Sequence, residues 1–136
     1  MSIPNRTSRG QPYQETARWA RHVGAMTSGA LRVVRADSVG NVIAAGDVEG
    51  TADLGTGPLA PLGVYDLLVA GFAAAGGATL FARRLGGMDY EGPYGIDVGH
   101  GGAIAIGGYF RGTVDLGTGP INGGPRDNGF VMMIAP

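Results

Sequence analysis

Three acidic residues, Asp47, Glu49 and Asp53, lie close together in the sequence and are the first candidates for chemistry. Their spacing could place carboxylates on one side of a strand, where carboxylate oxygens are suitable ligands for calcium. A similar stretch later in the chain has Tyr109 and Arg111 in place of the first two residues. This replacement excludes a repeated metal site, and the sequence favours a solvated strand edge over a single one. We therefore expect no metal.

Catalytic residues are also hard to assemble from this sequence. His22 and His100 are its two histidines, and the serines have no surrounding motif that would build a Ser-His-Asp triad. The chain has no cysteine, which excludes cysteine nucleophiles, disulfides and zinc–thiolate sites. We predict a protein that is not an enzyme and that needs no cofactor.

Aromatic residues provide the best binding candidates. Tyr90, Tyr94 and Tyr109 cluster in the second part of the chain together with Arg111. Tyrosine and arginine side chains on loops are typical of surfaces that recognise a protein or a glycan. We predict these four residues as the ligand-binding set, with a protein or a glycan as the partner, and we expect the neighbouring Phe110 to pack in the core.

The net charge of −1 and the lack of a long apolar run limit the other partners. Nucleic acids and anionic membranes attract clustered positive charge, which this balance does not indicate. A membrane-spanning helix needs about 20 consecutive apolar residues, and no run approaches that length. We expect neither nucleic acid nor membrane insertion.

The segments that carry these residues are repeated. Gly50–Pro58 recurs as Gly112–Pro120 with eight of nine residues identical, at an offset of 62 residues. The same offset relates Trp19 to Phe81. It also relates further pairs spread along the chain: Gly24 and Gly86, Met26 and Met88, Gly40 and Gly102, Val42 and Ile104, Gly46 and Gly108. Matches over the whole unit indicate a duplication.

Each copy is predicted to consist of short antiparallel strands. The apolar runs are too short for helices and are bounded by glycine, which favours strands: 31–34, 42–46, 65–72, 79–85, 94–98 and 104–108. Turns rich in Gly and Asn separate them, and the Ala-rich residues 71–78 are interpreted as a hairpin instead of a helix. The predicted fold is all-β, with residues 1–16 as a flexible polar lead-in, 17–78 as the first repeat and 79–136 as the second.

With these motifs in place, the sequence resembles the SBBP-type β-propeller repeats of large exported myxobacterial proteins. The resemblance covers Thr16 to the C-terminus. It rests on a Trp/Phe-x-Arg motif, a strand-Gly-strand hairpin, a Gly-Thr-x-Asp-Leu-Gly-x-Gly-Pro motif and an Asp before an apolar strand. The matching positions in the two copies are Trp19, Gly46, Thr51, Asp53, Gly55, Pro58 and Asp66, then Phe81, Gly108, Thr113, Asp115, Gly117, Pro120 and Asp127.

The resemblance implies antiparallel propeller blades and a non-catalytic scaffold or interaction module. It also suggests an extracellular or cell-surface location, although residues 1–14 contain no segment typical of an export signal. Trp19 and Phe81 are expected to pack between blades. The repeated aspartates, assigned as Asp53 with Asp115 and Asp66 with Asp127, are expected to fix turns through side-chain hydrogen bonds to the backbone.

Two repeats are fewer than the four to eight blades that are typical of closed propellers. One hypothesis is a ring-forming half-unit, in which Ala17–Gly24 of one molecule pairs with Asp127–Ile134 of another. The competing hypothesis is an incomplete propeller that is a piece of a longer one. A small carbohydrate-binding lectin that closes head to tail is the alternative function under the first hypothesis.

Overall fold

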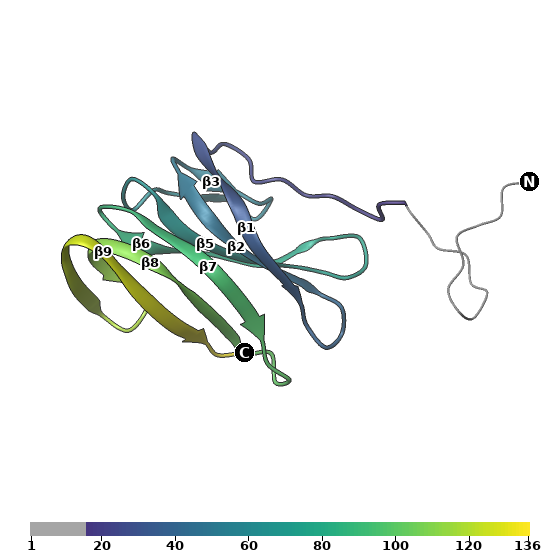
Figure 1. The fold of residues 1–136 in the computed structure, drawn as a ribbon. Coiled ribbons are helices and arrows are strands. Elements are labelled where there is room, and N and C mark those ends of the chain that lie inside the picture. Colours follow the sequence, from purple (N-terminus) through teal and green to yellow (C-terminus); the bar gives the residue numbers. More distant parts are fainter. Residues whose placement is uncertain (1–15) are drawn as a thin grey trace, which may run out of the picture.

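The computed structural model describes residues 16–136, which fold into strands and turns (Figure 1). Apart from Thr16, the predicted lead-in of residues 1–16 lies outside the described residues. The strands are β1 (Ser28–Ala36), β2 (Val42–Glu49), β3 (Ala52–Asp53), β4 (Pro58–Leu59), β5 (Asp66–Phe72), β6 (Thr79–Gly87), β7 (Glu91–Val98), β8 (Ile104–Asp115) and β9 (Pro120–Ile134). The all-β prediction is confirmed.

Seven of these strands form one antiparallel sheet that is curled into a half-barrel (Figure 1). Its first half consists of β1, β2, β5 and β6, which neighbour one another in that order, and its second half consists of β7, β8 and β9, with β8 in the middle. The end of β6 pairs with the end of β8 and joins the halves. The curl brings β7 over β1, β2 and β5, so the two halves face each other.

The turns agree with the predicted hairpins. Residues 73–78 connect β5 to β6 through backbone hydrogen bonds between Ala73 and Ala78 and between Gly77 and Ala73, so the hairpin interpretation of this Ala-rich stretch is confirmed. The segment Ala17–Gly24, which the sequence predicts to pair with a strand of another molecule, forms no strand within this chain. Its last residue, Gly24, makes an isolated β-bridge to Asp53. Residues 16–136 contain no helix that is long and apolar enough to cross a bilayer.

The strands of the two halves pair in the same register, displaced by 62 residues. Leu31↔Gly46 has its counterpart in Pro93↔Gly108, Val42↔Phe72 in Ile104↔Ile134, and Gly24↔Asp53 in Gly86↔Asp115. Even the register shift in β1, between Leu31 and Val33, recurs in β7 between Pro93 and Gly95. The backbone pairing therefore extends the sequence repeat to positions whose side chains differ.

The register also differs from one of the sequence assignments. Asp66 lies opposite Val48, and the residue at the corresponding place in β9 is Asn128, opposite Phe110. Asp127 lies one position earlier, opposite Arg111. Matching aspartate to aspartate therefore misaligned the two copies by one residue at this point, because the fold keeps the pairing partner instead of the side-chain type.

Two hydrophobic clusters stabilise the sheet. The larger one fills the space between the halves and includes Leu67, Val69, Ile106, Phe110 and Val114, with Phe81 packed against it. The smaller one lies on the other face of the first half and includes Val48, Leu54, Leu68 and Phe72, with Trp19 and Val23 packed against it. Trp19 and Phe81 thus occupy corresponding places, but Phe81 lies between the halves and Trp19 covers an outer face.

Two glycines at corresponding positions show how tightly the backbone is packed. A Cβ atom on Gly46 would collide with the carbonyl oxygen of Ala30, and one on Gly108 would collide with the carbonyl oxygen of Gly92. Both collisions are with backbone atoms of the adjacent strand, which a side-chain rotation cannot relieve. The close approach of β1 to β2 and of β7 to β8 therefore requires glycine at this place in each half.

Candidate functional site

A pocket of about 540 Å³ opens between the two halves of the sheet and is lined by side chains from both. Its lining residues are Arg32, Asp47, Tyr90, Pro93, Tyr94, Tyr109, Arg111 and Asp127. All four residues that the sequence analysis singled out for binding, Tyr90, Tyr94, Tyr109 and Arg111, are among them. Neighbouring strands place them there, because Tyr94 lies on β7 while Tyr109 and Arg111 lie on β8.

The second half supplies an aromatic wall. The rings of Tyr94 and Tyr109 lie with their centroids 5.4 Å apart at an interplanar angle of 34°. The guanidinium carbon of Arg111 lies 5.4 Å from the centroid of the Tyr90 ring, a cation–π geometry. Arg111 also forms an ion pair with Asp127 at 2.9 Å. The side chain of Tyr94 is 78% exposed, so one face of this wall is open to a ligand.

The first half supplies a charged wall. The Nε atom of Arg32 donates a hydrogen bond of 2.7 Å to Oδ2 of Asp47, and this bond raises the pKa of Arg32. The Asp47 side chain is only 8% exposed, and its other oxygen, Oδ1, has no hydrogen-bond partner among the described residues. Burial raises the pKa of Tyr109, and the negative charge of Asp47 raises it further, so the phenol keeps its proton.

Arg32 was missed by the sequence analysis, and Asp47 was considered only as a metal ligand. The repeat offset would have found both, because Arg32 corresponds to Tyr94 and Asp47 corresponds to Tyr109. The positions that carry the aromatic pair in one half carry the ion pair in the other. A residue at the position of a predicted binding residue in one copy is therefore a candidate in the other copy as well.

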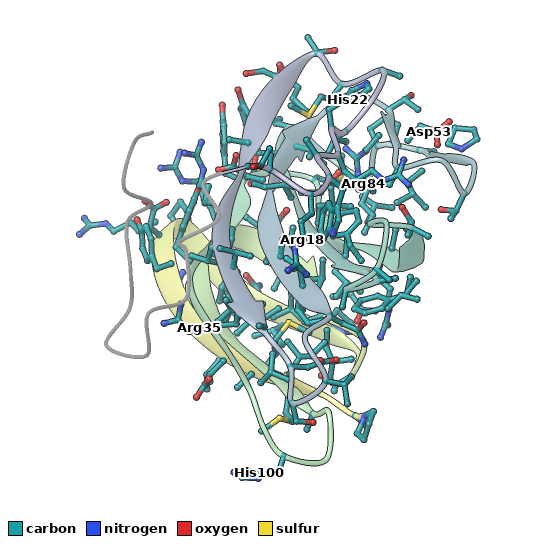
Figure 2. All side chains as sticks on the ribbon, turned by 90° about the vertical axis from the view of Figure 1, so that its right-hand side faces the viewer. Arg18, His22, Arg35, Asp53, Arg84 and His100 are labelled. Atoms are coloured by element: carbon teal, nitrogen blue, oxygen red, sulfur yellow. The ribbon has the colours of Figure 1, made fainter. Side chains whose placement is uncertain are left out.

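Of the other sequence candidates, Asp47 and Asp127 also line the pocket, whereas the aspartates of the repeated Gly-Thr-x-Asp motif do not. Asp53 and Asp115 instead accept hydrogen bonds of 2.8 Å from the backbone nitrogens of Gly55 and Gly117, which fixes two corresponding turns. His22 and His100 lie at opposite ends of the molecule (Figure 2). Among residues 16–136 there is no group of three His, Cys, Asp or Glu side chains that could hold a metal ion.

A second group of ionisable side chains is buried where the halves join. Asp66, from β5, accepts a hydrogen bond of 2.7 Å from Nε of Arg84, from β6. Arg84 also donates to the carbonyl oxygens of Gly50 and Leu59, so it connects the sheet to the β3–β4 hairpin. Figure 2 shows Arg84 at the same end of the molecule as Asp53 of that hairpin. This ion pair is nearly excluded from solvent, with side-chain exposures of 3% and 0%.

Glu91, the first residue of β7, completes this buried group. It is fully buried, and burial together with the nearby charges of Asp66 and Asp89 raises its pKa to about 7. Oε2 of Glu91 and Oδ1 of Asp66 have no hydrogen-bond partner in the described chain. A Cβ on Gly86 would lie 2.6 Å from the first oxygen and 2.8 Å from the second, so both face the same point. We interpret this group as a structural junction between the halves, separate from the pocket.

No protein-family model, curated protein or solved structure matches this chain, so the functional argument relies on the geometry of the pocket.

Proposed function

We propose that the chain is a pair of β-propeller-type blades that serves as a non-catalytic binding and scaffold module, as part of an exported or cell-surface bacterial protein. The first half supports the blade interpretation because it is a four-stranded antiparallel sheet, the unit of which propellers are built. The second half repeats the register of its first three strands. The resemblance to SBBP-type repeats is the basis for the proposed origin and location.

The observation that carries the binding role is the pocket between the halves. It combines an exposed aromatic pair with two arginines and a nearly buried carboxylate, which is the mixture of apolar faces and few convergent polar groups found in ligand sites. The same composition argues against catalysis. Asp47 is engaged by Arg32, and among the described lining residues no serine, threonine, cysteine or lysine nucleophile is present for a base to activate.

A glycan is the specific ligand that one observation favours. The Asp47 carboxylate lines the pocket beside Tyr109 and keeps 8% of its side chain exposed, so it can accept a hydrogen bond from a ligand hydroxyl. A carboxylate accepts such bonds more strongly than a neutral group does. The Tyr94 and Tyr109 rings provide apolar surface beside it, on which the apolar face of a sugar ring can pack. This arrangement supports the lectin alternative.

The test is a glycan panel screened with the full chain, followed by titration of any binder against matched variants. Tyr94→Ala and Asp47→Asn should each weaken binding about tenfold or more, which corresponds to about 1.4 kcal/mol. Tyr94→Phe should keep most of the affinity because it keeps the ring. His100→Ala, at the distant turn between β7 and β8, is the control and should change nothing.

Two outcomes would count against these proposals. A panel without any binder rejects the glycan, and the same variants would then be compared on a displayed peptide library. A peptide or glycan whose affinity is insensitive to both Tyr94→Ala and Asp47→Asn would contradict the pocket as the binding site.

A further inference from the structure

We propose that residues 17–23 of one copy of this chain add as a strand to the free edge of β9 in a second copy, so that copies assemble head to tail. The inference concerns the edges of the sheet and does not depend on the ligand of the pocket. It rests on the correspondence between the two halves. This correspondence shows which segment covers each surface within one chain and which surfaces of residues 16–136 stay uncovered.

The first observation is an incomplete second half. In the first half, β5 pairs with β2 on one edge and with β6 on the other. Its counterpart β9 pairs with β8 on one edge, and no strand among residues 16–136 pairs with the other. An unpaired strand edge presents free backbone N–H and C=O groups that a further strand can satisfy. Residues 16–136 therefore supply no counterpart of β6 to the second half.

The second observation is a segment that matches the missing strand. Counting back 62 residues from β6 gives residues 17–25, which keep its Trp/Phe-Ala-Arg motif and its glycine. Gly24 already bridges Asp53 as Gly86 bridges Asp115. No backbone hydrogen bond to the described chain involves residues 17–23, which are held by the side chains of Trp19, bonded to Ala74 O at 3.0 Å, and Arg21, bonded to Gly77 O at 2.6 Å. Their backbone is thus available for pairing.

The register of this pairing follows from β5 and β6. Transferring their pairs by the repeat offset places Met132 opposite Ala20 of the second copy, as Ala70 lies opposite Ala82. The complete set is Gly129 with Val23, Phe130 with His22, Val131 with Arg21, Met132 with Ala20, Met133 with Trp19 and Ile134 with Ala17. Met133 replaces Gly71, over which the Phe81 ring lies, and a flexible thioether can adjust to the Trp19 ring and contact it favourably.

The uncovered faces of the two halves also match. Val131 and Met133 are 83% and 67% exposed, although the counterpart of Val131 is Val69, which is buried between the halves. On the first half, an apolar groove of about 280 Å³ lies between Trp19 and β1 and includes Val34 and Ala44. The counterparts of these two residues, Ile96 and Ile106, are buried against the first half. A second copy would cover both faces in the way that one half covers the other.

The residues at the positions that correspond to the buried ionisable group are also consistent with this contact. At the positions of Asp66, Arg84 and Glu91, the contact between copies would bring together Asn128, His22 and Gly29. No carboxylate would be buried there, so no buried charge would lack a partner. Because the contact is heterologous, repeated addition gives a ring if the rotation closes and a filament if it does not.

The first test measures the mass of the full chain by light scattering at several concentrations. The wild type should show a multiple of the 13.8 kDa chain mass. Val131→Arg, at an exposed position that the register places opposite Arg21 of the second copy, should reduce the chain to a monomer or weaken assembly at least tenfold. Val39→Arg is the matched control, because Val39 is 74% exposed in the β1–β2 turn, away from either face. A wild type that stays monomeric, as a piece of a longer propeller would, overturns the proposal.

The second test checks the register and stays informative if Val131→Arg fails to fold. The chain has no cysteine, so a double variant with Ala20→Cys and Met132→Cys has only these two thiols in each copy, and peptide mapping distinguishes the designed bond between positions 20 and 132 from a bond between like positions. Opposed residues on neighbouring strands are close enough for this bond. Disulfide-linked species at multiples of the chain mass are expected. The counterpart pair Ala70→Cys and Ala82→Cys should link within one chain, and failure of only the first pair would overturn the proposed register.

Discussion

The two halves of the sheet share their backbone pairing but present different side chains to the pocket. Arg32 and Asp47 form an ion pair in the first half, whereas the corresponding Tyr94 and Tyr109 pack their rings together in the second. Two identical walls would face like with like, and the facing guanidinium groups would repel each other. The comparison shows that the strand framework and the ligand-facing positions vary independently, and that the pocket arises from the difference between the copies.

The junction of the halves also differs from the matching positions one repeat away, which carry Asn128, His22 and Gly29. Within the chain it contains Asp66, Arg84 and Glu91, all with buried side chains. Burying charges is costly unless they are paired and hydrogen bonded, so this group stabilises the junction only while it is complete.

The largest effect is expected from Arg84→Met, which removes the only guanidinium of the described junction and keeps an apolar side chain of similar length. Asp66 would then be a buried carboxylate without its ion pair, next to Glu91, and breaking such a pair from one side costs about 3–5 kcal/mol. Urea unfolding would measure this loss. Arg83→Met, which changes the exposed neighbouring arginine, is the control. If both variants lost equally little unfolding free energy, the junction would not need the ion pair.

The next largest effect concerns the place where the halves are most alike. Gly46→Ala and Gly108→Ala would each place a Cβ against a backbone carbonyl of the adjacent strand, and such overpacking costs about 2–3 kcal/mol. Similar losses in urea unfolding are expected from the two variants. Gly95→Ala should cost far less, because a Cβ there meets nothing within 4 Å. If only one of the first pair were destabilised, the two halves would not share this constraint.

The sequence predicted the framework because its signals are local and repeated. Glycine-bounded apolar runs indicated the strands, and the repeat offset indicated which residues correspond, including Trp19 with Phe81 and the turn-fixing Asp53 with Asp115. These features depend on backbone geometry that a residue type alone can indicate. The clustering of Tyr90, Tyr94, Tyr109 and Arg111 was also visible, because all four lie on or directly before β7 and β8 of one half.

The features that were missed depend on how the halves face each other. The repeat offset indicates Arg32 and Asp47 as candidates, but no local pattern indicates the curl that brings them to the same pocket from the opposite half. The Asp66, Arg84 and Glu91 group combines three strands, β5, β6 and β7, and it looks like three unrelated charges in the sequence. The misalignment of Asp66 with Asp127 has another origin, because the side-chain type was matched there instead of the 62-residue offset, which assigns Asn128 to that place in agreement with the pairing of β8 with β9.

The smallest expected effect is a pH dependence of the unfolding free energy, which should arise from Glu91 in the second half alone. Burial and the facing charges of Asp66 and Asp89 raise its pKa from 4.5 to about 7 in the folded chain, while Arg84 is held by Asp66. The folded state therefore binds this proton more tightly than the unfolded state does. The stabilisation that this bound proton gives to the folded chain is fully present below about pH 4.5 and is lost as the pH rises through about 7.

Glu91→Gln should remove this pH dependence, because the amide stays neutral and can still accept the hydrogen bond from Gly87 N. We expect the wild type to lose on the order of 2 kcal/mol of unfolding free energy between pH 5 and pH 8 relative to the variant. Urea unfolding at the two pH values measures it. The matched control is Glu49→Gln, at the end of β2 in the first half, whose slope should follow the wild type. Gly29 occupies the position of Glu91 in the first half, so this pH dependence has no counterpart there. Equal changes of unfolding free energy with pH in the wild type and in Glu91→Gln would show that Glu91 does not make the two halves differ in this way.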